Sequence, residues 1–360
     1  MFDELRSTVR GFAPYEQGYA LACKRLGKSP LSEQPFSTTT PIEVVHPNSK
    51  SIAESSARVI CVVTTVLNGE KFLGATLASV LSQSGDFFID YFIKDAGSTD
   101  GTASILQDCC RKIASGRPSL NCLGIRIRVE SMPDSGLYDA LHYSFKQDFW
   151  RNDPSDILTY INADDVFHVG AFEIACQVFL ASPAKWICGQ KHIINANGDL
   201  VVTPQFPLSY SREDIEAGLH DGRSLYFIQQ EGSFWLREIY SLVGGIDLSL
   251  KLAGDFDLWQ RFAAQTELLA LDRPLGSFRS HGGQLSSEID KYYAEVDGIQ
   301  RQRCCQPPSA AAGVGGEMQY FLGTKAPKGA REQRLGPVCF LSADGKVSEI
   351  AYIKRGWVTW

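Results

Sequence analysis

The sequence predicts an α/β protein with a mostly parallel central sheet and helices on both faces. Apolar, β-branched runs alternate four times with segments of helical periodicity, and the connections between them are short. The first run is apolar throughout, which is typical of a strand that is covered on both faces. Because each helix returns the chain to the start of the next strand, this order favours parallel strands.

The alternating elements run from Val59 to Leu180. The apolar run at 59–66 predicts the first strand, and apolar residues at helical spacing predict a helix at 70–83. The other predicted strands lie at 88–94, 125–130 and 157–162, and the other predicted helices lie at 102–112, 136–149 and 169–180.

Beyond residue 185 the alternation is looser. Strands are predicted at 186–194, 200–203, 233–236, 268–271 and 277–279, and helices at 238–243 and 255–266. Residues 1–57 are rich in proline and are predicted to be irregular apart from one helix near 15–27. A single hairpin is predicted at 340–347, within a C-terminal segment in which we find no chemistry.

Composition and missing motifs exclude several functions. The 35 basic and 41 acidic side chains give a net charge of −6, which argues against general nucleic-acid binding. No apolar run is long enough for a transmembrane helix, and no C-x-x-C pair indicates a zinc site. Leu67-Asn68-Gly69-Glu70 follows the first strand, so the glycine-rich loops of dinucleotide-binding and P-loop proteins are absent there.

Three predicted strands end in acidic or small polar residues, at 95–101, 130–136 and 162–165. In open parallel sheets, ligands bind beyond the carboxyl ends of the strands. An acidic pocket that holds a nucleotide needs a divalent cation between its carboxylates and the phosphates. The sequence therefore predicts a ligand site at this edge of the sheet.

Eight short motifs occur in order between Val59 and Ser286. They are T-V-L-N-G at 65–69, D-A-G-S-T-D-G-T at 95–102, P-D-S-G-L-Y-D-A at 133–140, N-A-D-D at 162–165, Q-E-G-S-F-W at 230–235, V-G-G-I-D at 243–247, A-G-D-F-D-L-W at 253–259 and F-R-S-H-G-G-Q-L-S at 278–286. In this order they resemble the inverting glycosyltransferases of family 2, which have the GT-A fold. The resemblance implies an N-terminal extension at 1–57, a GT-A glycosyltransferase domain at 58–303 and a C-terminal tail of unknown role at 304–360.

The resemblance implies a donor nucleotide site that contains Thr65, Asn68, Asp95, Asp134, Asn162 and Asp164. Asp95 would bind the nucleobase, most often uracil, with Thr65 beside it. Asp134 fits a donor contact and a helix cap equally well. Asn162 stands where the family's D-x-D motif has its first acid, so it would add a hydrogen bond but no charge.

The resemblance also implies a metal and a catalytic base. Asp164 would hold Mn²⁺ or Mg²⁺ on the donor diphosphate, and His281 would complete the metal site. Asp165 fits the role of a solvated turn acid. Asp255 would be the base that takes a proton from the acceptor hydroxyl, although acids at the start of a helix also serve as caps.

Gln230, Glu231 and Trp235 match the stretch that faces the acceptor in the family, and Trp235 fits a sugar-stacking role and a core role equally well.

The expected function is the transfer of a sugar from a UDP-linked donor to the hydroxyl of a saccharide or lipid-linked acceptor, with inversion. The expected pathway is cell-surface polysaccharide or glycolipid synthesis. The alternative, suggested by Asn162, is a catalytically inactive nucleotide-sugar binding module. We expect a cytoplasmic protein with peripheral contact to the inner membrane face.

Overall fold

The computed structural model describes residues 41–52, 55–204, 207–282, 284, 288–303, 319–321, 331–352 and 355–359. These residues belong to one compact unit, which spans residues 38–360. The helix predicted near 15–27 and most of the predicted irregular N-terminal segment lie outside the described residues. Among the described residues, no helix combines the length and the apolar character needed to span a bilayer.

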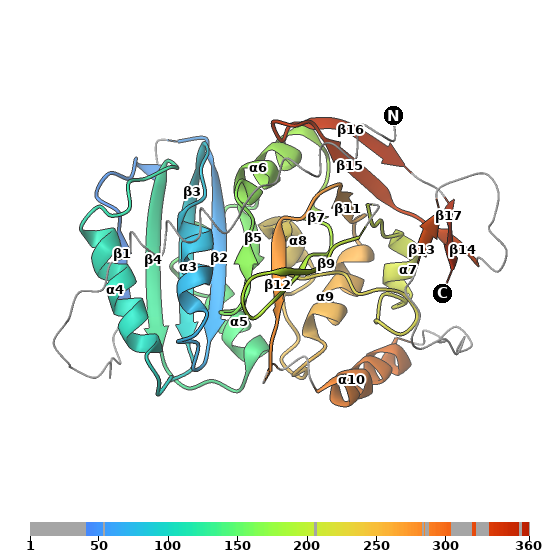
Figure 1. The fold of residues 1–360 in the computed structure, drawn as a ribbon, viewed down its shortest axis with the longest axis horizontal. Helices are drawn as coiled ribbons and strands as arrows, with labels where there is room; N and C mark the ends of the chain where they lie inside the picture. Colours follow the sequence, from blue (N-terminus) through green and yellow to red (C-terminus); the bar gives the residue numbers. More distant parts are fainter. Residues whose placement is uncertain are drawn as a thin grey trace. The chain divides into compact units, whose positions relative to one another are not determined.

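The described strands form three sheets (Figure 1). The strands are β1 (Ile42–Val45), β2 (Arg58–Val66), β3 (Phe87–Asp95), β4 (Gly124–Ser131), β5 (Ile157–Tyr160), β6 (Val166–Phe167), β7 (Trp186–Cys188), β8 (Ile193–Asn195), β9 (Leu200–Val202), β10 (Ser233–Leu236), β11 (Leu269–Leu271), β12 (Gly276–Ser280), β13 (Gln319–Phe321), β14 (Arg331–Arg334), β15 (Pro337–Leu341), β16 (Val347–Tyr352) and β17 (Arg355–Thr359). The described helices are α3 (Leu73–Leu81), α4 (Thr102–Ala114), α5 (Leu137–Phe145), α6 (Ala171–Ala181), α7 (Arg212–Glu216), α8 (Arg237–Leu242), α9 (Gly254–Ala263) and α10 (Ile289–Gln302).

The largest sheet has the strand order β1-β4-β3-β2-β5-β10-β7-β11-β15-β16. β2 pairs in parallel with β3 and β5, and β3 pairs in parallel with β4. β10 lies between β5 and β7 and is antiparallel to both, whereas β7, β11 and β15 are parallel to one another. Almost every residue of β2 and β3 is buried, which explains why their sequences are mostly apolar.

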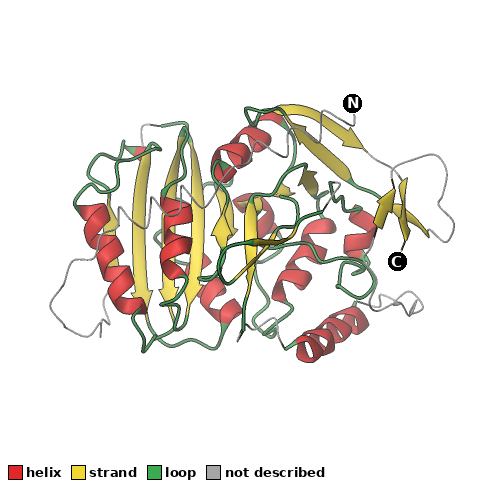
Figure 2. Cartoon of the chain, in the orientation of Figure 1, coloured by secondary structure: helices red, strands yellow, loops and turns green. Residues whose placement is uncertain are grey.

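The order of the parallel strands reverses beside β2. The chain moves from β2 to β3 and β4 in one direction and then returns to β5 on the other side of β2. Because crossovers between parallel strands are right-handed, α3 and α4 cover one face of the sheet and α5 covers the other. α3 packs beside α4, and α5 packs on β2 and β3 (Figure 2). The predicted fold class, a mostly parallel α/β sheet with helices on both faces, is confirmed.

The sheet extends beyond the limits predicted for the domain, 58–303. β1 lies within the predicted extension and pairs antiparallel with β4. β15 and β16 lie within the predicted tail, and β15 pairs in parallel with β11. Val338 and Cys339 of β15 are fully buried. The hairpin predicted at 340–347 is therefore the β15–β16 hairpin. The pairings of β1 with β4 and of β15 with β11 join segments that are distant in sequence, so local apolar patterning does not reveal them.

The strand predicted at 186–194 is two strands in different sheets. After β7, the N–H of Gly189 donates to the carbonyl of Gly232 (3.0 Å) and the N–H of Gln190 donates to the carbonyl of Arg273 (2.9 Å). A Cβ at Gly189 would overlap the backbone of Leu275. This close passage takes the chain into β8, part of a smaller sheet with the order β6-β12-β8-β9.

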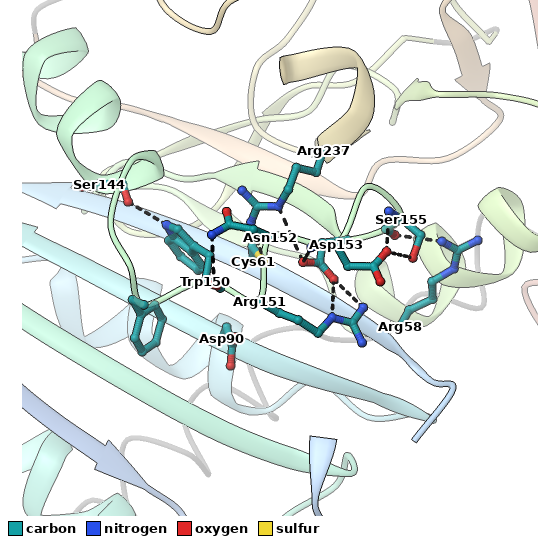
Figure 3. A network of polar contacts seen from close by, with 12 residues as sticks. Arg58, Cys61, Asp90, Ser144, Trp150, Arg151, Asn152, Asp153, Ser155 and Arg237 are labelled. Carbon is teal, nitrogen blue, oxygen red and sulfur yellow. Dashed lines mark hydrogen bonds and ion pairs between the residues drawn. The ribbon is translucent and has the colours of Figure 1, made fainter. Parts of the chain in front are cut away.

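A buried polar network lies at the amino ends of β2 and β5, whereas the predicted ligand site lies at the carboxyl ends of the strands (Figure 3). Asp156, just before β5, is fully buried and pairs with Arg151 (2.5 Å) and with Arg237 (3.6 Å). Arg237 also donates to the sulfur of Cys61 at 3.4 Å. Burial raises the pKa of the Asp156 carboxyl, and the neighbouring arginines oppose that shift. Replacing Asp156 by an uncharged residue would leave the buried Arg237 guanidinium without this ion pair.

Candidate active site

Three of the sequence-predicted donor residues meet where the strand order reverses. Thr65 lies near the end of β2, Asp95 ends β3, and Asn162 follows β5, which pairs with β2 on the opposite side from β3. In the β2–β3 register, Thr65 is opposite Lys94, and Val66 is opposite Asp95. This reversal is where open α/β sheets bind ligands beyond their strand ends.

Asp95 is buried and saturated with hydrogen bonds. Ser98 donates to its Oδ1 from the N–H (3.1 Å) and from the hydroxyl (2.5 Å), and the hydroxyl of Ser131 donates to Oδ2 at 2.5 Å. The acid that contacts the start of α4 is Asp100, which accepts the N–H of Thr102 at 3.0 Å, and the N-cap residue of the helix is Gly101. A ligand N–H that binds Asp95 must therefore displace one of the serine hydroxyls.

The loops that follow β2 and β3 are bound to each other. Asn68 accepts the N–H of Thr99 at 2.9 Å and donates its own N–H to the hydroxyl of Ser98 at 2.7 Å. Glu70 accepts the N–H of Gly101 at 3.0 Å. Asn68 is thus a connecting residue of the site's rim, with a φ of 53° that asparagine tolerates better than most residues.

Asp134 is paired with a buried lysine. The ammonium group of Lys94 lies 3.5 Å from Oδ2 of Asp134 and also donates to the carbonyls of Asp95 and Met132. Oδ1 of Asp134 accepts the N–H of Gly136 at 3.0 Å, one residue before α5. Asp134 therefore combines an ion pair with a helix-start contact, and it joins the loop after β4 to the end of β3.

The Asn162–Asp165 loop is held rigidly by its neighbours. Arg279 of β12 donates its N–H to Oδ1 of Asp165 and its Nε to the carbonyl of Asp164, both at 2.7 Å. The Thr76 hydroxyl lies 2.8 Å from the carbonyls of Ala163 and Asp165. Asn162 donates its side-chain amide to Asp165 at 3.4 Å. These contacts leave the Asp164 carboxylate facing outward.

Asp164 and His281 are brought together from distant parts of the chain. Nε2 of His281 lies 2.9 Å from Oδ2 of Asp164, and Nδ1 lies 2.9 Å from the carbonyl of Gly282. The side-chain amide of Gln284 donates to the same Asp164 oxygen at 3.1 Å. Phe72 packs on the imidazole with 4.6 Å between ring centroids. The two sequence-predicted metal ligands thus form one pair.

Asp165 is not the solvated turn acid that its sequence position suggested. It is fully buried and hydrogen-bonded to Glu231, which is also buried. Burial, followed by the charge of Glu231, raises the pKa of Asp165, and burial likewise raises the pKa of Glu231. Two buried carboxyl groups in contact share a proton rather than carry two charges. This pair fastens the Asn162–Asp165 loop to the turn before β10.

Asp255 lies at the start of α9 with one carboxylate oxygen open. The Tyr138 hydroxyl donates to Oδ1 at 3.1 Å, and the N–H of Phe256 donates to the same oxygen at 2.8 Å. Within the described part of the chain, all hydrogen bonds to this carboxylate fall on Oδ1. Burial raises the pKa of Asp255, although these two hydrogen bonds oppose the shift. Ala253, not Asp255, is the N-cap residue of α9.

The family of the chain follows from a sequence comparison. The profile described as "Glycosyl transferase family 2" matches residues 61–240, half of the chain. The chain belongs to glycosyl transferase family 2. Its mostly parallel sheet, with helices on both faces, is the GT-A fold expected for that family. No curated protein matches the sequence significantly.

Two solved structures resemble this family 2 member. One is TarS 1-349 of S. aureus in complex with UDP-GlcNAc, with 14% identity and a TM-score of 0.48 over 68% of this chain and 70% of that chain. The other is the mannosyltransferase PcManGT of Pyrobaculum calidifontis in complex with GDP-Man and Mn²⁺. It has 16% identity and a TM-score of 0.44 over 82% of this chain and 72% of that chain.

The donor set at Asp164 fits a divalent cation that is shared with a diphosphate. The described residues contain no group of three or more acidic, histidine or cysteine side chains that would hold a metal by themselves. Mg²⁺ is commonly bound by one or two carboxylates together with substrate phosphates and water. The Gly282 carbonyl accepts the Nδ1 proton of His281, which directs Nε2 toward Asp164. One carboxylate and one oriented imidazole are therefore an adequate protein contribution.

The three residues expected on the acceptor side of this glycosyltransferase have three different environments in the structure. Gln230 is buried and donates its amide to the carbonyl of Tyr160 at 2.5 Å, and its Oε1 accepts no hydrogen bond from the described residues. Glu231 pairs with Asp165. Trp235 is fully buried and packs on Trp259 with 5.5 Å between ring centroids. No face of the Trp235 ring is open to a sugar, so the core role is the correct one.

Sequence reasoning missed several residues that position the site. They are Lys94, Tyr138, Arg279 and Glu295. The glycine at position 254 was a sequence signal for Tyr138, because a Cβ at Gly254 would lie 2.8 Å from the Tyr138 ring. Tyr138 can approach Asp255 only because residue 254 has no side chain. Arg279 lies inside the F-R-S-H motif, but nothing in the sequence indicated that it binds the Asn162–Asp165 loop.

Proposed function

We propose that this glycosyltransferase moves a sugar from a UDP-linked donor to a hydroxyl group of a saccharide or lipid-linked acceptor, with inversion. The observation that carries the proposal is the Asp255 carboxylate, whose Oδ2 accepts no hydrogen bond from the described residues and whose pKa is raised by burial. A sugar hydroxyl is a weak nucleophile until a base removes its proton, and a raised pKa makes a carboxylate a better base. Resemblance to bacterial enzymes supports a role in surface polysaccharide or glycolipid synthesis, in the cytoplasm or peripherally at the inner membrane face.

At the donor end, Asp164 and His281 are proposed to hold Mn²⁺ or Mg²⁺. When bound, the cation would neutralise the charge that grows on the leaving diphosphate. Asn162 is proposed to contribute a hydrogen bond, and its amide already orients the loop through Asp165. Gln284, which binds the same Asp164 oxygen as His281, would release it to the cation.

The nucleobase is proposed to bind at Asp95, with Thr65 beside it on the neighbouring strand. A uracil N–H can take the place of the Ser98 or Ser131 hydroxyl on the Asp95 carboxylate. Asn68 and Asp134 are proposed to shape the rim on either side, since they hold the loops after β2 and β4 against β3. Because these residues are already hydrogen-bonded, the nucleotide would bind a preorganised surface.

Inversion requires the acceptor to attack from the face opposite the leaving diphosphate. Asp255 comes from the start of α9, whereas Asp164 and His281 come from the loop after β5 and the end of β12. A base and a leaving-group site on separate elements support single displacement. The hydroxyl proton then passes to Asp255 as the new glycosidic bond forms and the bond to the diphosphate breaks.

Asn162 favours a second candidate, a nucleotide-sugar binding module without turnover. Release of UDP from a panel of UDP-sugars, measured with Mn²⁺, with EDTA and with Mn²⁺ added after EDTA, separates the two. The proposed enzyme should release UDP with Mn²⁺, stop in EDTA and recover when Mn²⁺ is restored. Binding of a UDP-sugar without release, with and without added saccharides, would support the binding module. Full activity in EDTA would remove the metal role from Asp164 and His281.

A further inference from the structure

An aromatic patch lies on the surface formed by α10 and the loop at 221–228. It consists of Phe227, Tyr292 and Tyr293. The ring centroids of Phe227 and Tyr292 are 5.7 Å apart, and those of Tyr292 and Tyr293 are 5.4 Å apart. Phe227 is 37% exposed. The other large apolar side chains that are exposed in the described part of the chain are not aromatic. The exposed Phe227 and the partly exposed Tyr292 and Tyr293 form a continuous cluster of rings.

The ring of Phe227 is held in place. Gly222 has a φ of 85° and lies against the outer end of the ring, where a Cβ would overlap Cζ and the two Cε atoms. Phe227 also meets Tyr292 edge to face, with an angle of 72° between the rings. The aromatic surface is therefore formed before any ligand arrives, which lowers the entropic cost of binding.

The patch adjoins the candidate base. Tyr292 packs on the apolar cluster that contains Ala253 and Phe256, the residues on either side of Gly254 and Asp255. Burial, and then the negative charge of Asp255, raises the pKa of the Tyr292 phenol. Glu295, one turn further along α10, accepts the N–H groups of Leu252 and Ala253, each at 2.9 Å. The helix that carries the patch is thus fastened to the segment that carries the base.

A polar rim surrounds the rings. The guanidinium carbon of Arg223 lies 4.5 Å from the centroid of Tyr293, and Arg223 pairs with Asp297 at 2.5 Å and with Asp221 at 3.3 Å. Carbohydrates present a face of C–H groups and an edge of hydroxyls. Aromatic rings are negative on their faces and attract the C–H groups, while charged side chains bind the hydroxyls. A lipid chain or a second copy of this chain would need a broader apolar surface without such a rim.

We propose that Phe227, Tyr292 and Tyr293 form the subsite for the pyranose ring of the acceptor. This inference rests on the proposed function, since it takes Asp255 as the base that the acceptor hydroxyl must reach. The ring lies on Phe227 and Tyr292, its hydroxyls meet the Arg223 rim, and one hydroxyl points to Oδ2 of Asp255. The assignment replaces Trp235, which is buried, as the aromatic contact for the acceptor.

Saturation-transfer NMR on the full chain with Mn²⁺ and UDP tests the subsite. The probes are methyl β-glycosides of glucose, galactose, mannose and N-acetylglucosamine. The unmodified chain should transfer saturation to the C–H protons of at least one glycoside. Phe227→Ala should weaken that binding about tenfold, the upper part of the range for one aromatic contact. Phe227→Tyr keeps the ring and should retain binding. Leu242→Ala, at a side chain 67% exposed on α8, is the matched control and should change nothing.

The outcomes separate this inference from the proposed function. The subsite would be overturned if the glycoside signals are unchanged in Phe227→Ala or are absent from the unmodified chain. It would also be overturned if octanol, added as a lipid-like competitor, removes those signals by itself. Signals lost in Phe227→Ala and retained in Phe227→Tyr and Leu242→Ala would support it. The UDP protons give a second readout in the same spectra. No transfer to UDP in the unmodified chain would contradict the proposed function, whatever the glycosides show.

Discussion

At the scale of single residues, the site depends on how burial sets the charge of a few carboxyl groups. Asp165 and Glu231 are buried beside each other, burial raises the pKa of both carboxyl groups, and the pair acts as a structural fastening. Asp255 is also in a buried environment, but Tyr138 and Phe256 each donate a hydrogen bond that favours its ionised form. Asp164 keeps its carboxylate toward the surface. The same residue type is thus a structural fastening at Asp165, and we propose it as the base at Asp255 and the metal ligand at Asp164.

Replacing Asp255 by Asn should remove catalysis and leave nucleotide binding intact. The amide keeps the size of the side chain and accepts the same hydrogen bonds from Tyr138 and Phe256, but it cannot take a proton. We expect kcat to fall by about 10²–10⁴-fold. The Kd for UDP, measured by calorimetry, and the melting temperature should stay near their unmodified values. Normal turnover per folded molecule in Asp255→Asn would show that Asp255 is structural.

The pH profile of transfer should carry the signature of the raised Asp255 pKa. A base acts only when ionised, so kcat/KM should fall as the pH falls through this pKa, above the ordinary value of 3.8. Tyr138→Phe removes a hydrogen bond that lowers the pKa and should move the acidic limb to still higher pH. Initial rates across the acidic range, with protein stability checked at each pH, measure the limb. A limb at or below 3.8 would exclude Asp255 as the base.

At the scale of elements, α9, the helix that carries the proposed base Asp255, is held by α10. Glu295 of α10 accepts the N–H groups of Lys251, Leu252 and Ala253 at 2.9–3.1 Å. These amides precede α9, which begins without a side-chain cap of its own. Glu295 therefore acts as a cap of α9 that is supplied by another helix, and it fixes the backbone that positions Asp255.

Glu295→Ala should destabilise the protein and slow transfer together. It leaves three amides without their partner, at a cost of about 1–3 kcal/mol. The melting temperature and kcat should both fall, whereas the KM for the UDP-sugar should change little. Glu288→Ala is a matched control, because Glu288 is exposed and its ion pair with Lys291 adds little. Equal behaviour of the two variants in thermal melts and rate assays would refute the capping role.

The sequence predicted elements well where one segment carries its own signal. The buried run at Val59–Val66 and the helix that follows needed no partner to be recognised. β1 was missed because it is short and pairs with a strand far along the chain, and the hairpin predicted at 340–347 is the turn between β15 and β16. The pairing of β15 with the distant β11 was not predicted. The same distinction applies to the site. Asp255 and Asp164 were found from motifs, whereas the contacts of Glu295 and Arg279 exist only in the folded chain.

At the scale of the whole molecule, the large sheet depends on the C-terminal segment. β11 pairs with β7 on one side and with β15 on the other, and it has only three residues. Without β15, the N–H and carbonyl groups on one side of β11 would be unpaired, and the apolar surface now covered by Val338 and Leu341 would be open. The segment after Arg303 therefore completes the fold of this glycosyltransferase.

Removing residues 304–360 should produce a chain that aggregates. The exposed β11 edge offers a template for pairing with other chains, and the lost burial removes stability. We expect the shortened chain to elute as large species in size-exclusion chromatography, or to be insoluble. A control that ends at Tyr352 keeps β15 and β16 and should remain in solution. A well-folded chain that ends at Arg303, with the unmodified melting temperature, would show that β15 is dispensable.

The late position of β15 also has a consequence for synthesis. The ribosome makes β7 and β11 well before it reaches Pro337, the first residue of β15. At roughly 5–20 residues per second, the interval between β11 and β15 lasts several seconds. During that time the nascent chain carries an incomplete sheet with an open edge, so chaperones have a window in which to bind it. Only after Tyr352, the last residue of β16, has left the exit tunnel can the large sheet be complete.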